Sequence, residues 1–114
     1  MDILSLTKTA AKALADKKAT NIRILDISKL SSLADYFVIC SCSSSTQVKA
    51  CCDEAEEKVE EAGGRLRHSE GYNGGLWVLL DFGDFIVHVM QEETREFYDI
   101  ERLWSDAVNI EFTE

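Results

Sequence analysis

The segment LWVLLDFGDFIVHVMQ, residues 76–91, contains two apolar runs separated by Gly83 and Asp84. Both runs are rich in β-branched and aromatic residues, which favour strands, and a Gly-Asp pair between two such runs indicates a tight hairpin. Residues 76–82 and 85–91 are therefore predicted to form two adjacent strands. Both faces of this hairpin are mostly apolar, so either face can pack on the core.

The remaining elements follow from hydrophobic periodicity along the chain. In chain order we expect a helix over 2–18, strands over 21–27 and 36–42, a helix from the serine run 43–46 to 62, an edge strand over 65–69, the hairpin, and a helix over 94–107. This order, αββαβββα, indicates an α/β fold with a single mixed β-sheet and flanking helices. With 114 residues the chain has room for one core, so 1–114 is predicted to be a single domain.

The charge balance restricts the class of partner. The chain has 12 Lys and Arg against 21 Asp and Glu, a formal net charge of −9. Phosphate binding depends on Lys and Arg neutralising backbone charge, so we expect little or no direct nucleic-acid binding. A basic protein partner is compatible with this charge, although an acidic surface also simply aids solubility.

The first 18 residues, MDILSLTKTAAKALADKK, lack the features of a targeting signal. They have no basic start, no continuous apolar run and no cleavage site, and they are too broken to span a membrane. We therefore expect a cytoplasmic protein with reduced thiols, while a mature organelle protein would look the same.

The cysteines do not form a metal-binding pattern. Cys40, Cys42, Cys51 and Cys52 lack the paired spacing of a zinc site, and no histidine lies near them in the sequence. They fall inside apolar patterns, where free cysteine is usually a buried and inert side chain. No metal or cofactor is expected.

The histidines and the serine run are better explained by structure than by catalysis. His68 and His88 could act as acid or base beside Asp81 or Asp84, but the sequence identifies no nucleophile or pocket next to them. The serine run 43–45 lacks the glycine spacing and the lysine of a phosphate loop, so helix capping is the favoured interpretation.

The hairpin presents two apolar faces. One face carries Val78, Leu80, Phe85, Val87 and Val89, and the other carries Trp77, Leu79, Asp81, Ile86, His88 and Met90. If helices cover only the first face, the second is an exposed apolar patch of the kind that marks a protein partner, with Trp77 and Met90 as favoured anchors. If the final helix covers the second face, Trp77 is a core residue. The pattern alone leaves both interpretations open.

Three segments occur in order: ADYFVICSCSSSTQVKA (34–50), EGYNGGLWVLLDFGDFIVHVM (70–90) and REFYDIERLW (95–104). They resemble three parts of the ribosome-silencing-factor family, also called Iojap-like. The first segment resembles that family's strand, serine-rich turn and helix start, and the second resembles its hairpin with the Glu-Gly, Trp and Val-His positions. The third resembles its C-terminal helix. Where many relatives have a Thr-Gly-Thr turn, this chain has Cys42 and the serine run, a departure that should leave docking unaffected.

The resemblance implies a function that depends on binding and involves no catalysed reaction. Family members have a sheet similar to the nucleotidyltransferase fold and bind large-subunit ribosomal protein fourteen, a basic protein, at the face that meets the small subunit. They thereby block subunit joining and repress translation when nutrients are scarce, and isolated members tend to be homodimers. The family's partner surface maps here onto Trp77, Leu79, Asp84, His88, Met90 and Tyr98, and Trp77, Leu79, His88 and Met90 are expected to point away from the core.

Two other functions are compatible with the pattern. The first is nucleotidyl transfer, which needs a Gly-Ser pair at a helix start and nearby carboxylates that bind a metal. Here Ser43-Ser44 lacks the glycine, and no Asp-x-Asp lies on a strand facing that turn. No enzyme is therefore expected, because a fold alone does not carry a function. A structural dimer could bury the Trp77 face between two copies, and this can coexist with docking.

Overall fold

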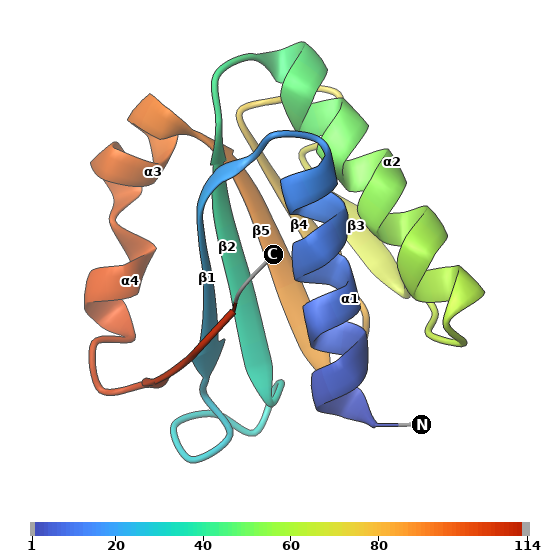
Figure 1. Cartoon of the computed structure of the whole chain (residues 1–114). Coiled ribbons are helices and arrows are strands. Elements are labelled where there is room, and N and C mark those ends of the chain that lie inside the picture. The colour runs from blue at the N-terminus through green and yellow to red at the C-terminus, as the bar shows by residue number, and fades with distance from the viewer. Residues whose placement is uncertain (1, 113–114) are drawn as a thin grey trace.

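The structure, a computed structural model, describes residues 2–112. Six strands form one mixed sheet with helices on both faces (Figure 1). The elements are α1 (Ile3–Asp16), β1 (Thr20–Asp26), β2 (Tyr36–Cys42), α2 (Ser45–Glu61), β3 (His68–Glu70), β4 (Trp77–Asp81), β5 (Phe85–Gln91), α3 (Glu92–Tyr98), α4 (Ile100–Leu103) and β6 (Val108–Ile110). The predicted α/β class with a single mixed sheet is confirmed.

The strand order is β3-β4-β5-β2-β1-β6. The central pair, β2 and β5, is parallel, and every other neighbouring pair is antiparallel. The predicted hairpin is present as β4 and β5, with Trp77 opposite Met90 and Leu79 opposite His88. These four residues therefore share one face, as their alternation along the strands predicts.

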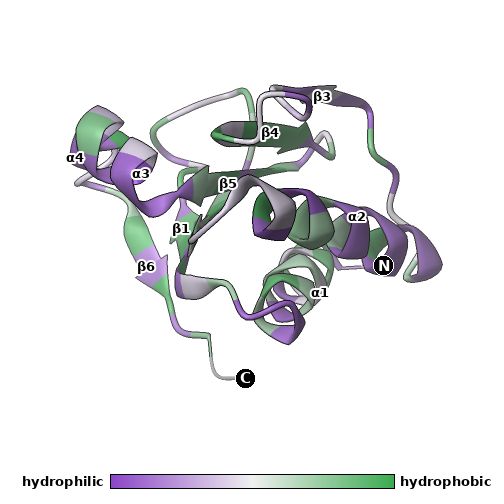
Figure 2. Cartoon of the chain, turned by 90° about the horizontal axis from the view of Figure 1, so that it is seen from above, coloured by the Kyte–Doolittle hydropathy of each residue, from purple (hydrophilic) through white to green (hydrophobic). Residues whose placement is uncertain are grey.

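The main core lies between the sheet and the α1–α2 layer. Figure 2 shows α1 and α2 on one face of the sheet and α3 and α4 beyond the other. Val78, Leu80, Val87 and Val89 point into this layer and are at most 2% exposed. Helix α2 begins where the serine run predicts, because the Ser44 hydroxyl accepts the Gln47 backbone N–H at 3.1 Å.

A second, smaller core lies on the opposite face, under α3 and α4. It comprises Leu25, Ile27, Ala34, Phe37, Ile39, Met90 and Ile100, with Trp77, Ile86, Trp104 and Ala107 packed against it. The alternative in which the C-terminal region covers part of this face is therefore the correct one.

The C-terminal region differs from the prediction of one helix over 94–107. Asp99 adopts left-handed backbone angles, φ 45° and ψ 52°, and separates α3 from α4. The chain then forms β6, which pairs antiparallel with β1 and was not predicted. The turn at Asp99 is what lets the segment bend back over the sheet, because an unbroken helix would continue past it. The edge strand is also displaced, to β3 from the predicted 65–69.

Candidate functional site

Neighbouring aromatic rings form a continuous row across the second face of the sheet. In order, the row comprises Phe97, Tyr98, Trp77, His88, Phe37 and Trp104, with neighbouring centroids 5.0, 5.1, 6.0, 4.8 and 5.0 Å apart. These separations fall within the range of favourable aromatic contacts. Phe97 is 80% exposed and Tyr98 is 55% exposed, whereas His88 and Phe37 are buried. The row therefore connects exposed aromatic surface to the second core.

Trp77 and His88 are joined by a hydrogen bond in the middle of this row. The Trp77 indole N–H donates to Nδ1 of His88 at 3.1 Å. An imidazole that accepts at Nδ1 is neutral and carries its proton on Nε2. Within the described residues that Nε2 has no hydrogen-bond partner, and the imidazole packs edge-to-face with Phe37. The bond fixes the orientation of the Trp77 indole.

Burial also determines the charge of His88. The side chain is 5% exposed, and this desolvation lowers its pKa to about 4 from the ordinary value of 6.5. His88 is therefore neutral at pH 7 and keeps Nδ1 available as an acceptor. Its role in the site is to position Trp77.

Two hollows share the half-buried Trp77 in their lining. The larger hollow, of about 560 Å³, is lined by Gly71, Gly74, Leu76, Trp77, Glu93, Thr94, Phe97 and Tyr98. The smaller hollow, of about 360 Å³, is lined by Glu70, Gly71, Trp77 and Leu79. Trp77 and Gly71 thus border both hollows, and each hollow has one carboxylate among its lining residues.

The loop between β3 and β4 shapes both hollows. Gly71 has φ 84°, and a Cβ there would lie 2.2 Å from the carbonyl oxygen of Trp77, so only glycine fits. Gln91 Nε2 donates to the carbonyl of Gly75 at 2.8 Å, and the Tyr72 hydroxyl donates to the Asp53 carboxylate on α2. The loop is therefore attached to both β5 and α2.

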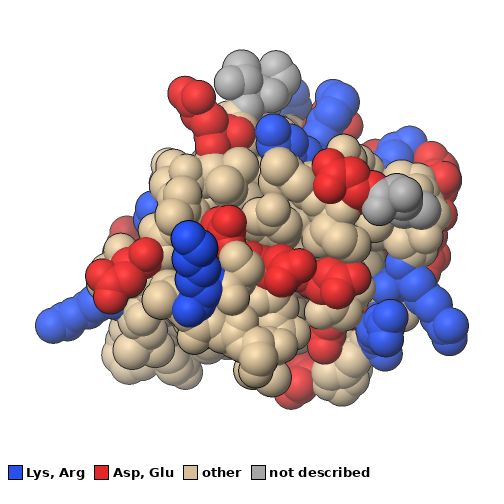
Figure 3. Space-filling view, turned by 90° about the horizontal axis from the view of Figure 1, so that it is seen from below, with Lys and Arg blue, Asp and Glu red and all other residues tan. Residues whose placement is uncertain are grey.

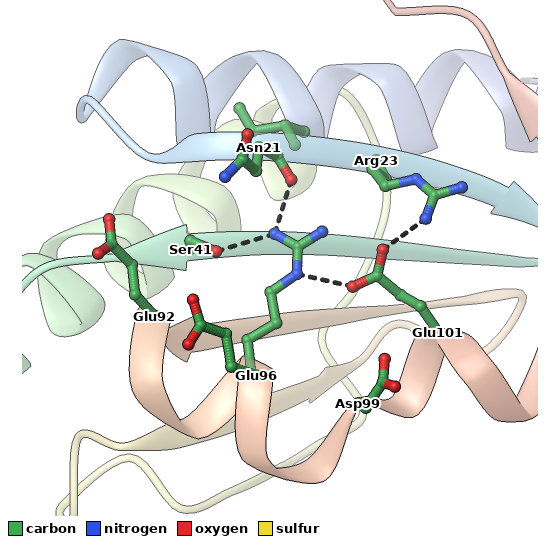
Figure 4. Close-up of a pocket in the computed structure, with 9 residues that line it drawn as sticks. Asn21, Arg23, Ser41, Glu92, Glu96, Asp99 and Glu101 are labelled. Carbon is green, nitrogen blue, oxygen red and sulfur yellow. Dashed lines mark hydrogen bonds and ion pairs between the residues drawn. The ribbon is translucent and has the colours of Figure 1, made fainter.

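A buried arginine attaches α3 and α4 to the sheet. Arg95 lies on α3, and Figure 4 shows its partners, with Asn21 and Ser41 on the strands and Glu101 on α4. The Arg95 guanidinium donates to the Asn21 carbonyl at 2.7 Å, to the Ser41 hydroxyl at 2.9 Å and to the Glu101 carboxylate at 2.8 Å. Glu101 also pairs with Arg23, and these hydrogen bonds, that from Arg95 most strongly, lower the pKa of Glu101. We call these five residues the Arg95 clamp.

The structure brings together only part of the predicted partner surface. Trp77 and Leu79 are half-buried and Tyr98 is exposed, all beside the hollows. His88 is 5% exposed and Met90 is fully buried, so the expectation that they point away from the core is wrong. The physical reason is the cover supplied by α3 and α4, which makes this face a second core.

Asp84 lies apart from these residues. It is exposed at the β4–β5 turn, whereas Trp77 begins β4 at the other end of the hairpin. Its backbone carbonyl accepts the Asp35 N–H at 2.8 Å, which places the two acidic residues side by side. Figure 3, which views this end of the molecule, shows acidic side chains across the middle of the face with basic side chains among and beside them. Asp84 also lines a hollow together with Arg65 and Arg67, so it lies in a region of mixed charge away from the aromatic row.

Sequence reasoning missed three residues that shape the larger hollow. Phe97 reads as part of the apolar stripe of a single final helix, but the turn at Asp99 leaves it exposed. Glu93 and Leu76 carry no distinguishing pattern in the sequence. Helix periodicity could not show that Phe97 stays exposed, because it assumes a helix that does not bend, and it has no bearing on Leu76, which precedes β4.

All four cysteines are buried free thiols. The Sγ atoms of Cys42 and Cys51 lie 3.7 Å apart, and hydrogen bonding to Cys40, followed by burial, raises the pKa of Cys42 to about 12. Thiols of this kind are poor nucleophiles, since the thiolate is the reactive form. Within residues 2–112, no group of three His, Cys, Asp or Glu residues is arranged to hold a metal ion.

Comparison with known proteins identifies close relatives. The family model described as ribosomal silencing factor during starvation, RsfS, matches residues 1–114. A protein named ribosomal silencing factor RsfS from Chromobacterium violaceum is 44% identical over 104 residues, covering 91% of this chain and 85% of that protein. The protein of the same name from Bacillus subtilis is 41% identical over 107 residues, covering 94% and 91%.

The fold also matches a solved structure. A crystal structure of a Chromobacterium violaceum protein superposes with a TM-score of 0.90 at 41% identity, covering 100% of this chain and 94% of that one. In the part of the chain that the structure describes, no helix is long and apolar enough to cross a membrane.

The pKa of His88 makes stability depend on pH. Between its folded pKa of about 4 and its unfolded value of 6.5, the unfolded chain binds more protons, so stability falls as pH falls through this window. The loss attributable to His88 is about 3 kcal/mol, at 1.36 kcal/mol per pKa unit. Urea unfolding at several pH values measures it. His88→Asn, whose amide oxygen can replace Nδ1, should flatten the profile, and an equally steep profile in this variant would contradict the assignment.

Within the Arg95 clamp, removing the buried Arg95 should destabilise the protein more than removing the exposed Arg23. Arg95→Met leaves Ser41 and Glu101 without their buried donor and should lower the free energy of unfolding by about 3 kcal/mol. Arg23→Met removes a more exposed partner of the same carboxylate and should cost at most about 1 kcal/mol. Hydrogen exchange should show lost protection over 92–103 in the first variant only. Equal effects of the two substitutions would argue against a clamp centred on Arg95.

Proposed function

This chain belongs to the ribosomal silencing factor family, and from that membership we propose that it represses translation by docking on the large ribosomal subunit and blocking its association with the small subunit. The contact is made with large-subunit ribosomal protein fourteen, notably when nutrients are limiting. The proposal places the protein in the compartment that holds the ribosomes, the cytoplasm in a bacterium. The mechanism requires only binding and the volume of the bound protein, and no covalent bond is made or broken.

The observation that carries this proposal is the exposed end of the aromatic row. Trp77, Tyr98 and Phe97 present ring surface to solvent beside two hollows, and aromatic residues of this kind are favoured anchors of protein interfaces. The indole is held by His88 and the loop by Gln91, so little side-chain freedom is lost on docking. Leu79 extends the surface into the smaller hollow.

His88 and Met90 take an indirect part in the proposed contact. Both lie beneath the surface, where Met90 packs in the second core and His88 orients the indole. They support the anchor residues from below and do not touch the partner. Asp84 acts at a distance, as one of the acidic groups that give the chain its net charge of −9 and so raise the rate of encounter with a basic protein.

Steric exclusion follows from size. The molecule measures 32 × 32 × 26 Å along its principal axes. A rigid body of these dimensions, bound on a surface that the small subunit must cover, leaves no room for the joined ribosome. The likeness to the nucleotidyltransferase fold is a proposal about architecture, and no catalytic role follows from it, because a fold does not carry a function.

The docking proposal is tested by sedimentation with purified ribosomal subunits. The wild-type protein should migrate with the large subunit and reduce the fraction of joined ribosomes. Trp77→Glu and Tyr98→Glu place a charge at the anchor and should weaken binding by at least about 30-fold, the effect of losing a hot spot. Leu33→Ala is a matched control, since Leu33 is 82% exposed on the β1–β2 loop, at the opposite end of β2 from the Trp77 side. Unchanged co-migration of the two charge variants would refute this surface.

We also propose that the free protein is a homodimer in which a second copy covers the same aromatic surface. Analytical ultracentrifugation over a range of concentrations should show a dimer that dissociates when ribosomal protein fourteen is added. Tyr98→Glu should shift the equilibrium toward monomer, because it charges the shared surface. A dimer that binds the ribosomal protein without dissociating would place the two surfaces apart.

A further inference from the structure

We infer that the larger hollow beside Trp77 receives an arginine side chain of the docking partner. This inference rests on the proposed function and specifies what the partner must offer at that surface. The hollow joins aromatic ring surface and one carboxylate in a single place, and that combination selects a planar cation over an apolar group or an anion.

Three aromatic residues, Trp77, Phe97 and Tyr98, line the larger hollow. The Trp77 and Tyr98 centroids are 5.1 Å apart with their planes inclined by 48°, and Phe97 meets Tyr98 edge-to-face at 5.0 Å. The rings are therefore not stacked flat on one another, and their surfaces border the hollow. The faces of such rings attract a cation through their quadrupole, most strongly for Trp.

The charge of the larger hollow is negative. Glu93 is the one charged residue among those that line it, and among the described residues no Lys or Arg makes an ion pair with Glu93. Arg95, on the same helix, donates to Asn21, Ser41 and Glu101 in the clamp, so it does not neutralise Glu93. Glu92 and Glu96 add further exposed carboxylates on α3. A phosphate or a carboxylate ligand would be repelled here.

Arginine fits this arrangement better than lysine. Its guanidinium is planar, stacks on aromatic faces and is weakly hydrated, and it can still donate hydrogen bonds to a carboxylate. The hollow is also prearranged: His88 fixes the Trp77 indole, and the Arg95 clamp fixes the helix that carries Glu93 and Tyr98. Its volume of about 560 Å³ leaves room for a whole side chain.

The test uses a small probe that needs no ribosome. N-acetyl-arginine methylamide is titrated into the isotope-labelled full chain, at a concentration at which ultracentrifugation shows the monomer, while the Trp77 indole N–H signal is followed by NMR, with Trp104 as an internal reference. A saturable shift confined to Trp77 is expected, with binding at least about fivefold weaker for N-acetyl-citrulline methylamide, the neutral isostere, in line with a cation–π contribution. Glu93→Gln should weaken the arginine probe about fivefold, whereas Glu92→Gln, an equal change of charge on a residue outside the hollow, should change it by less than about twofold.

The outcomes separate this inference from the docking proposal. Equal binding of the citrulline analogue, equal effects of Glu93→Gln and Glu92→Gln, or tighter binding of the corresponding lysine analogue would each overturn the arginine assignment. If wild-type protein migrates with the large subunit and Glu93→Gln does so with unchanged affinity, docking stands and the arginine site fails. If the probe binds as expected but no large subunit is bound, the site stands and the docking proposal fails.

Discussion

The buried guanidinium of Arg95 decides which part of this molecule is core and which part is surface. It reaches from α3 to a backbone carbonyl of β1, a hydroxyl of β2 and a carboxylate of α4, and so binds four elements to one group. Without that attachment, two short helices of seven and four residues have little apolar surface with which to hold their place. With it, they cover the second core and leave Phe97 and Tyr98 facing solvent.

A graded transition from core to surface is the result. Along the aromatic row, Phe37 and His88 are buried, Trp77 is half-buried and Tyr98 is exposed. An anchor residue of this kind has its inner edge packed and its outer edge free, which gives it both a fixed orientation and surface to bury on docking. The neutral state of His88 is needed for this fixed orientation, since a charged imidazole could not accept the hydrogen bond from the Trp77 indole.

Much of the fold follows from the local pattern of the chain. The hairpin, α1, α2 and the two faces of β4 and β5 are specified by periodicity and by short-range signals such as Gly83 and Ser44. Trp77 could be named as a candidate from the pattern of the hairpin, whereas Tyr98 was named only because the resemblance to a family supplied it. The burial of Met90 could not be decided from the pattern, since it depends on where the segment after Asp99 packs, and that in turn depends on Arg95 finding partners on distant strands. The position of Glu93 could not be predicted either, because no local sequence pattern marks it and only the fold places it in the same hollow as Trp77.

The pairing of β1 with β6 has a consequence for how the protein reaches its active form. Ile24 lies opposite Ile110, so one edge of an early strand has no neighbour until almost the last described segment of the chain has been made. Contacts between residues so far apart in sequence form slowly, because the entropy of closing the loop must be overcome first. The helices that carry Phe97, Tyr98 and Arg95 lie in that same closing loop. The aromatic surface is therefore completed late in folding, when the segment that carries it closes against the distant strand β1.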